Sequence, residues 1–149
     1  MYNKCDMKNM IKIRLSKQSD IPQLEEIFLV SRQQAFHWKQ PDSFEVEDFK
    51  KFTAGEVVLV AEENREILGF LSIWPMEHFI HNLFIHPDRQ NRGAGKLLLK
   101  KAIELFPPPL ELKAIIYNIK ACQFYEKQGW SIVETHVDAP EPYHLYRYV

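Results

Sequence analysis

Apolar residues recur along this chain at two spacings, every second position or every third to fourth, and the spacing changes repeatedly. Residues 11–15 alternate apolar and polar side chains, which predicts a β-strand. Further on, Leu24, Ile27 and Phe28 recur at helical spacing. Asp20 and Gln23 are predicted to form a capping box at the start of that helix. The chain is therefore predicted to open with a strand followed by a helix.

The middle of the chain combines a weakly patterned segment with three predicted strands. Residues 31–52 contain several aromatic side chains without a regular period, and they are predicted to form short helical turns. The apolar runs 57–62 and 67–74 flank a polar tetrapeptide, which predicts an antiparallel hairpin. The run 78–85 is rich in β-forming residues and predicts a third strand.

The rest of the chain alternates helices and strands. Helical spacing of apolar residues begins at Ala94 and is stopped by the prolines at 107–109. The later elements are predicted as a strand over 110–117, a helix over 118–129 and a closing hairpin of 130–137 with 143–149. The predicted order of elements is β-α-α-β-β-β-α-β-α-β-β.

Composition limits the class of protein. With 149 residues, of which 46% are hydrophobic, the chain can bury one core and is expected to form a single domain over residues 1–149. A net charge of -1 gives no basic field for nucleic acid. No window approaches membrane-spanning length, so we expect a cytoplasmic protein without a membrane partner. Cys5 and Cys122 are expected to be free thiols, and no spacing of His, Cys, Asp or Glu predicts a metal site.

The hexapeptide Gln90–Gly95 joins a predicted strand to a predicted helix. The first N–H groups of a helix have no intrahelical acceptor, and the helix dipole adds positive charge there, so backbone alone can bind a diphosphate. Gly93 and Gly95 lack the Cβ atoms that would obstruct close approach, and Arg92 and Lys96 add charge. Taken alone, two such glycines are more typical of an ordinary tight turn.

Two motifs in the correct order resemble those of the GCN5-related N-acetyltransferase superfamily. Gln90, Gly93 and Gly95 match its acetyl-CoA signature, and the preceding residues 83–87 match its apolar strand end followed by proline. A second motif matches at Asn118, Ala121, Phe124, Tyr125, Gly129 and Trp130. The resemblance implies an α/β (α+β) fold: a mixed, mostly antiparallel sheet of about six or seven strands, flanked by about four helices and splayed between its fourth and fifth strands.

The resemblance also implies how the acyl donor, acetyl-CoA, is bound. The pantetheine arm would pair with exposed strand backbone in the splayed wedge, and main-chain donors there would polarise the thioester carbonyl. The diphosphate would lie on the N–H groups of the glycine turn. No metal is implied. The implied cofactor-binding residues are Leu83, Phe84, Ile85, Gln90, Asn91, Arg92, Gly93, Ala94, Gly95, Lys96, Asn118, Phe124 and Tyr125.

Transfer of an acetyl group to an amine needs a base for the amine and an acid for the departing thiolate. By resemblance, Tyr125 is the general acid, although it also fits as a core aromatic of an amphipathic helix. His81 is a candidate base, and Glu77 and His78 are alternatives acting through water. A lone strand histidine is also common as a hydrogen-bonded surface or core residue. Strict alternation would place His81 on the same face of its strand as Leu83.

The acceptor is the least determined part of the prediction. Phe36, Trp38 and Tyr143 are candidates to line its pocket, although Phe36 and Trp38 could equally close the core beneath a loop. The resemblance implies direct transfer in a ternary complex to a primary amine, either of a small molecule or of a protein lysine or N-terminus. An acyl-CoA-binding module of the same fold, with little or no turnover, is the alternative. The chain is expected to act as a monomer or homodimer.

Overall fold

The computed structural model describes residues 10–149, which form one seven-stranded sheet in the order β1-β2-β3-β4-β5-β7-β6. Cys5 lies outside the described residues. The strands are β1 (Lys12–Leu15), β2 (Val57–Glu63), β3 (Glu66–Trp74), β4 (Phe79–Ile85), β5 (Leu110–Ile115), β6 (Ser131–His136) and β7 (Tyr143–Tyr148). The α-helices are α1 (Ile21–Ala35), α2 (Asp48–Thr53), α3 (Ala94–Leu105) and α4 (Ile119–Lys127). This order confirms the predicted succession of elements.

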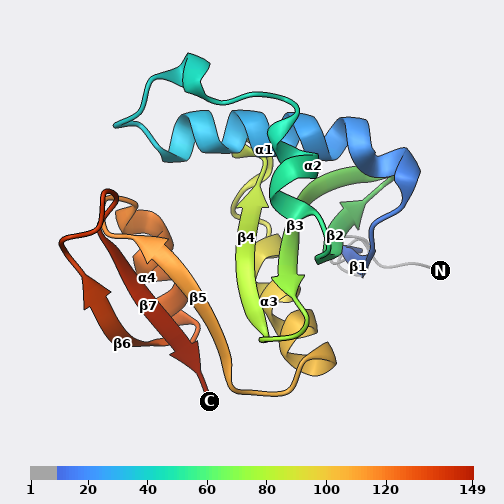
Figure 1. The fold of residues 1–149 in the computed structure, drawn as a ribbon. Coiled ribbons are helices and arrows are strands. Elements are labelled where there is room, and N and C mark those ends of the chain that lie inside the picture. The colour runs from blue at the N-terminus through green and yellow to red at the C-terminus, as the bar shows by residue number, and fades with distance from the viewer. Residues whose placement is uncertain (1–9) are drawn as a thin grey trace.

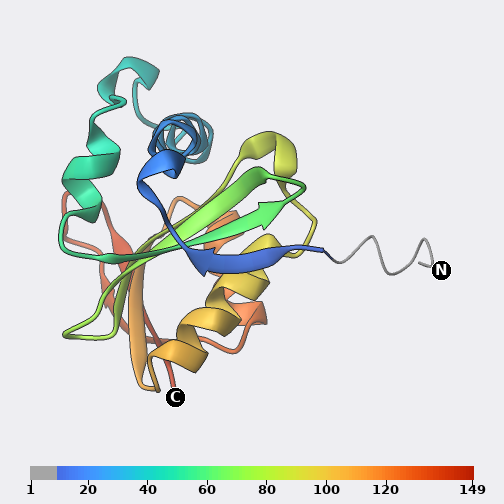
Figure 2. The same cartoon turned by 90° about the vertical axis from the view of Figure 1, so that its right-hand side faces the viewer.

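Helices cover both faces of the sheet, with α1 and α2 on one side and α3 on the other (Figure 2). The helical spacing of α1 buries Leu24, Ile27 and Phe28 against strands β2 and β3. On the opposite face, Leu98 of α3 belongs to one buried cluster with Tyr125 of α4. Amphipathic helices therefore close a core on each face of the sheet.

The sheet opens into a wedge between β4 and β5, which run side by side at one end and then diverge (Figure 1). This parallel ladder has only two register pairs, Phe79 with Glu111 and Ile80 with Leu112. The other neighbouring strands pair antiparallel. The predicted splayed, mostly antiparallel sheet is confirmed.

A β-bulge lies where the two strands begin to part. Asn82 of β4 is opposite Ser72 of β3, and Ile80 is opposite Ile73, so His81 is left without a partner. An extra residue in one strand bends that strand and increases its twist. The bulge therefore accompanies the opening of the wedge.

The predicted capping box at the start of α1 is wrong. Asp20 caps the preceding 3-10 turn (Gln18–Asp20), because its Oδ2 accepts a hydrogen bond from the Lys17 N–H at 2.7 Å, and it also pairs with Arg14. Gln23 Oε1 instead accepts from the Ile67 N–H at 3.3 Å. Asp20 is thus used by the preceding turn and by Arg14, and Gln23 by a residue of β3 that is distant in sequence.

Candidate active site

The turn before α3 presents free backbone donors. Gly93 is the N-cap residue. Its φ of 87° is a left-handed backbone conformation that residues with a Cβ rarely adopt. The first N–H of the helix to find an intrahelical acceptor is that of Leu97, which donates to the Gly93 carbonyl at 3.1 Å, so the N–H groups of residues 94–96 have no acceptor within the helix. Gln90, Asn91 and Arg92 are exposed beside them.

The second motif packs directly against this turn. A Cβ added to Gly95 would lie 3.2 Å from Cζ of Phe124, so a small residue here lets α4 approach α3. At the start of α4, Asn118 is the cap, because its Oδ1 accepts from the Ala121 N–H at 3.3 Å. Arg92 forms an ion pair with Glu63 at 3.2 Å, and Lys96 is exposed.

The wedge exposes backbone of β4 at alternate residues. The His86 N–H bonds to the Leu68 carbonyl of β3 at 2.8 Å, and antiparallel pairs alternate between bonded and non-bonded. The register therefore turns the backbone groups of Leu83 and Ile85 toward the wedge, and those of Phe84 toward β3. The Ile85 carbonyl also accepts from Ser31 Oγ at 3.2 Å.

These features fit the extended shape of an acyl-CoA. Free N–H groups at 94–96 suit the diphosphate, and open strand backbone at Leu83 and Ile85 suits the amides of the pantetheine arm. The ring of Phe84 packs against Phe28 at 5.4 Å, on the α1 side of the sheet.

The predicted orientation of His81 is wrong, because the bulge turns its side chain to the other face of β4. Alternation placed His81 with Leu83, but the extra residue puts it with Asn82 and Trp74 in a pocket on the α2 side. Its Nδ1 contacts the Oε2 of Glu56. Glu77 is exposed in the β3–β4 turn, outside this pocket's lining.

Glu56 was missed by sequence reasoning, since it stands alone before a strand and belongs to no motif. Its side chain is only 3% exposed, whereas that of His81 is 46% exposed. Only the register across β2, β3 and β4, bulge included, could have brought these two residues together.

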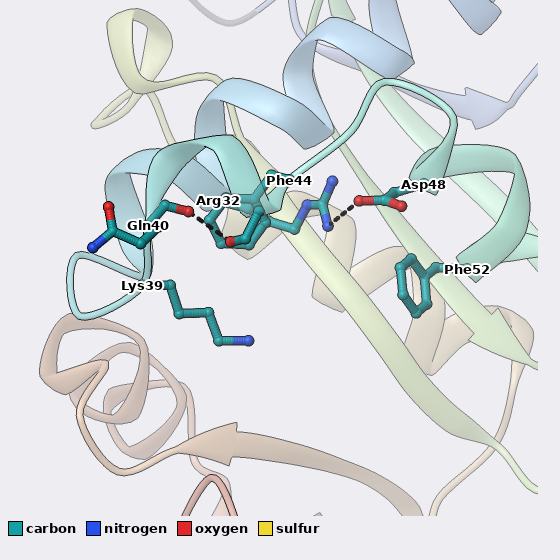
Figure 3. Close-up of a pocket in the computed structure, with 7 residues that line it drawn as sticks. Arg32, Lys39, Gln40, Phe44, Asp48 and Phe52 are labelled. Atoms are coloured by element: carbon teal, nitrogen blue, oxygen red, sulfur yellow. Dashed lines mark hydrogen bonds and ion pairs between the residues drawn. The ribbon is translucent and has the colours of Figure 1, made fainter.

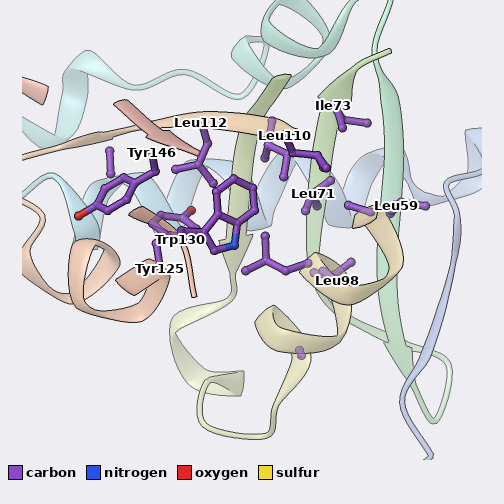
Figure 4. Close-up of a cluster of buried hydrophobic side chains, with 14 of the residues drawn as sticks. Leu59, Leu71, Ile73, Leu98, Leu110, Leu112, Tyr125, Trp130 and Tyr146 are labelled. Carbon is purple, nitrogen blue, oxygen red and sulfur yellow. The ribbon is translucent and has the colours of Figure 1, made fainter. Parts of the chain in front are cut away.

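Tyr125 lies in the buried cluster between α4 and the sheet (Figure 4). Its ring packs against Tyr146 at 5.9 Å and Trp130 at 6.3 Å between ring centroids. Burial raises the pKa of Tyr125, with a smaller contribution from Cys122 in the same direction. The hydroxyl therefore stays protonated at neutral pH.

The structure brings two of the three candidate acceptor residues, Phe36 and Trp38, into contact, and it places Tyr143 in a different aromatic pair. Phe36 contacts Trp38 at 5.3 Å and Phe84 at 6.2 Å, and Trp38 reaches Tyr117 at 5.5 Å, all between ring centroids. Tyr143 stacks on His136 at 4.7 Å, at the β6–β7 hairpin. None of the three predicted residues lines either of the two pockets found on the α1–α2 side.

The first of these pockets, of about 480 Å³, lies between α1 and α2 (Figure 3). Its buried Arg32 forms an ion pair with Asp48 at 3.1 Å and lies 3.7 Å from the ring centroid of Phe28. Burial lowers the pKa of Arg32, and the partner carboxylate opposes that effect. Phe52 lines both pockets, so they adjoin.

Across residues 10–149, no helix is both long and apolar enough to cross a bilayer. In the same part of the chain, no cluster of three or more His, Cys, Asp or Glu side chains could hold a metal ion.

Similarity to known proteins agrees with this geometry. The profile described as Acetyltransferase (GNAT) family matches residues 21–130. Over 129 residues the chain is 32% identical to the peptidyl-lysine N-acetyltransferase YiaC of Escherichia coli (strain K12), covering 82% of this chain and 84% of that protein. It is also 32% identical over 136 residues to the uncharacterized N-acetyltransferase YafP of the same organism, covering 85% of each.

Solved structures share the fold at lower identity. The apo form of YjaB from Escherichia coli gives a TM-score of 0.78 at 23% identity, covering 94% of this chain and 98% of that chain. The PaiA N-acetyltransferase of Thermoplasma acidophilum, solved in complex with coenzyme A, gives 0.77 at 18% identity, covering 93% and 99%. Fold, motifs and relatives together define an acyltransferase. The chain belongs to the GNAT family of acetyltransferases, as its two motifs predicted.

Proposed function

We propose that this protein transfers the acetyl group of acetyl-CoA to a primary amine, directly and within a ternary complex. The observation that carries the proposal is the juxtaposition of the β4–β5 wedge with the free N–H groups after Gly93. A relative named as a peptidyl-lysine N-acetyltransferase supports an amine acceptor. The amine belongs to a small molecule or to a protein lysine or N-terminus.

Each part of the transfer is assigned to residues of this chain. The turn at 92–96 binds the diphosphate, and the backbone of Leu83 and Ile85 orients the pantetheine arm. Bound acetyl-CoA supplies the thioester. Tyr125 protonates the departing thiolate, and His81 accepts the proton of the incoming amine.

The test combines binding with turnover. Acetyl-CoA binding is measured by titration calorimetry. Release of free coenzyme A thiol is then followed with aliphatic amines, a lysyl peptide with a blocked N-terminus and a peptide with a free N-terminus. Binding together with amine-dependent thiol release supports the proposal. Failure to bind acetyl-CoA overturns it.

The burial of Tyr125 favours a second candidate function, an acyl-CoA-binding module with little turnover. A general acid has to reach the departing sulfur, and this ring belongs to the core. Tight binding of acetyl-CoA with no thiol release on any amine of the panel would favour this module over the transferase.

A further inference from the structure

The most unusual side chain near the wedge is the buried carboxylate of Glu56. Its side chain is 3% exposed, and its Oε2 contacts His81. Its Oε1 is buried and has no hydrogen-bond partner among the described residues. Burying a carboxylate is costly unless its oxygens are paired, so an unpaired buried oxygen points to a donor that a ligand supplies.

Glu56 also determines which nitrogen of His81 is free. A carboxylate only accepts hydrogen bonds, so the Nδ1 facing Glu56 carries the hydrogen. Nε2 therefore keeps its lone pair and can take a proton. Because the His81 side chain is 46% exposed, that proton can pass on to solvent.

The surrounding pocket, of about 460 Å³, suits an amine on an apolar stem. Phe52 and Trp74 supply aromatic lining, and the faces of such rings attract ammonium groups. Asn82 also lines the pocket and is held in place, since its Nδ2 donates to Ser72 Oγ at 2.8 Å. Lys51 also lines the pocket, so the lining carries both signs of charge, and Glu56 is its carboxylate acceptor for an ammonium N–H.

The position of the pocket connects it to the wedge. His81 follows Ile80, which makes the last register pair with β5, and precedes Leu83, whose backbone faces the wedge. A ligand beside His81 therefore lies next to the point where β4 and β5 part.

We propose that the pocket at the β4 bulge is the acceptor subsite, in which Glu56 binds the N–H of a primary amine on an apolar stem and positions His81. This inference rests on the proposed acetyl transfer. The incoming ammonium loses one proton to His81 Nε2, and the free amine forms the C–N bond with the thioester carbon as the C–S bond breaks. The nitrogen then loses its second proton and the thiolate gains one, so one proton is released per turnover.

The test uses 2-phenylethylamine as the probe, both as acceptor and as a ligand for the protein saturated with coenzyme A. Glu56→Gln removes the charge and keeps the shape of the side chain. We expect about tenfold weaker binding of the amine and an equal rise in its KM, with the KM for acetyl-CoA unchanged. The neutral analogue 2-phenylethanol is expected to bind weakly to both proteins.

Rescue by a conservative variant separates positioning from mere packing. Glu56→Asp keeps the carboxylate that Glu56→Gln loses, so it is expected to restore most of the amine binding and most of the KM for the amine. Glu134→Gln is the matched control, because Glu134 contacts His136 at 2.8 Å on the exposed strand β6. It is expected to leave amine binding and both KM values unchanged.

A second variant tests amine binding at an exposed residue, in case Glu56→Gln does not fold. Phe52 is 53% exposed, so Phe52→Ala should fold normally and weaken binding of 2-phenylethylamine by about tenfold. Unchanged amine binding in Glu56→Gln, or no binding of 2-phenylethylamine by a parent that acetylates other amines, overturns the inference. A parent that acetylates no amine instead overturns the proposed function.

Discussion

The ring of Tyr125 is buried, and its hydroxyl makes no hydrogen bond among the described residues. Tyr125→Phe should therefore leave the free energy of unfolding nearly unchanged, because no buried partner loses its bond. If the hydroxyl protonates the thiolate, kcat falls by about 100-fold or more while the KM for acetyl-CoA stays constant. Steady-state kinetics and urea unfolding measure the two effects.

Tyr146 provides the matched control for this variant. Its hydroxyl donates to Glu126 at 2.8 Å, so Tyr146→Phe should lose about 1 kcal/mol of stability and retain activity. Parent-like kcat in Tyr125→Phe would exclude Tyr125 as the acid and leave it a core aromatic.

Asp20 should make stability depend on acid pH. The hydrogen bonds from Arg14 lower the pKa of Asp20, although burial acts in the opposite direction. A lowered folded pKa adds stability that is present above the ordinary aspartate value of about 3.9 and is lost as the pH falls through the folded value. Asp20→Asn should therefore cost about 1.5–3 kcal/mol near pH 7 and progressively less below about pH 4. Urea unfolding at both pH values checks this, and a cost that is independent of pH would contradict it.

Strands and helices were predictable where an apolar period is long and a breaker follows. α3 illustrates this, with Leu98, Leu99 and Ala102 buried at helical spacing before the prolines at 107–109. The bulge in β4 was not predictable, because residues 78–85 contain no glycine or proline that would mark it. One extra residue moves every later side chain to the opposite face, which is why alternation gave His81 the wrong face.

A Cβ at Gly93 should strain the turn that begins α3. No atom lies within 4 Å of a Cβ built there, so the cost of Gly93→Ala comes from its φ of 87° alone, about 1–2 kcal/mol. Relief of that strain would reorient the N–H groups at 94–96 and weaken coenzyme A binding by about tenfold. Titration calorimetry and urea unfolding measure both.

Gly129 offers a turn with the same strain away from the proposed diphosphate site. Its φ is 91°, and it follows α4. Gly129→Ala should lose similar stability and keep parent-like coenzyme A binding. Equal loss of affinity in both variants would show that instability, and not the geometry of the turn at Gly93, weakens binding.

Across the molecule, the motifs identified the wedge and the turn, because both are built from neighbouring residues. The pairing of Glu56 with His81 could not be read from the sequence in the same way. These residues are 25 positions apart and meet only through the combined register of three strands. Likewise, Arg32 and Asp48 lie in the weakly patterned segment, and their ion pair depends on how α2 folds back on α1.

The β4–β5 ladder is the shortest in the sheet, with two register pairs, so a ligand in the wedge should change its dynamics most. A pantetheine arm would give the N–H groups of Leu83 and Ile85 partners that β5 does not provide. We expect coenzyme A to slow amide hydrogen exchange at these two residues and over 92–96, with little change in β2. Adenosine 3′,5′-bisphosphate lacks the pantetheine arm, so it should protect the turn alone. If intact coenzyme A also protects only the turn, the pantetheine arm does not pair with β4 and the wedge is not its binding site.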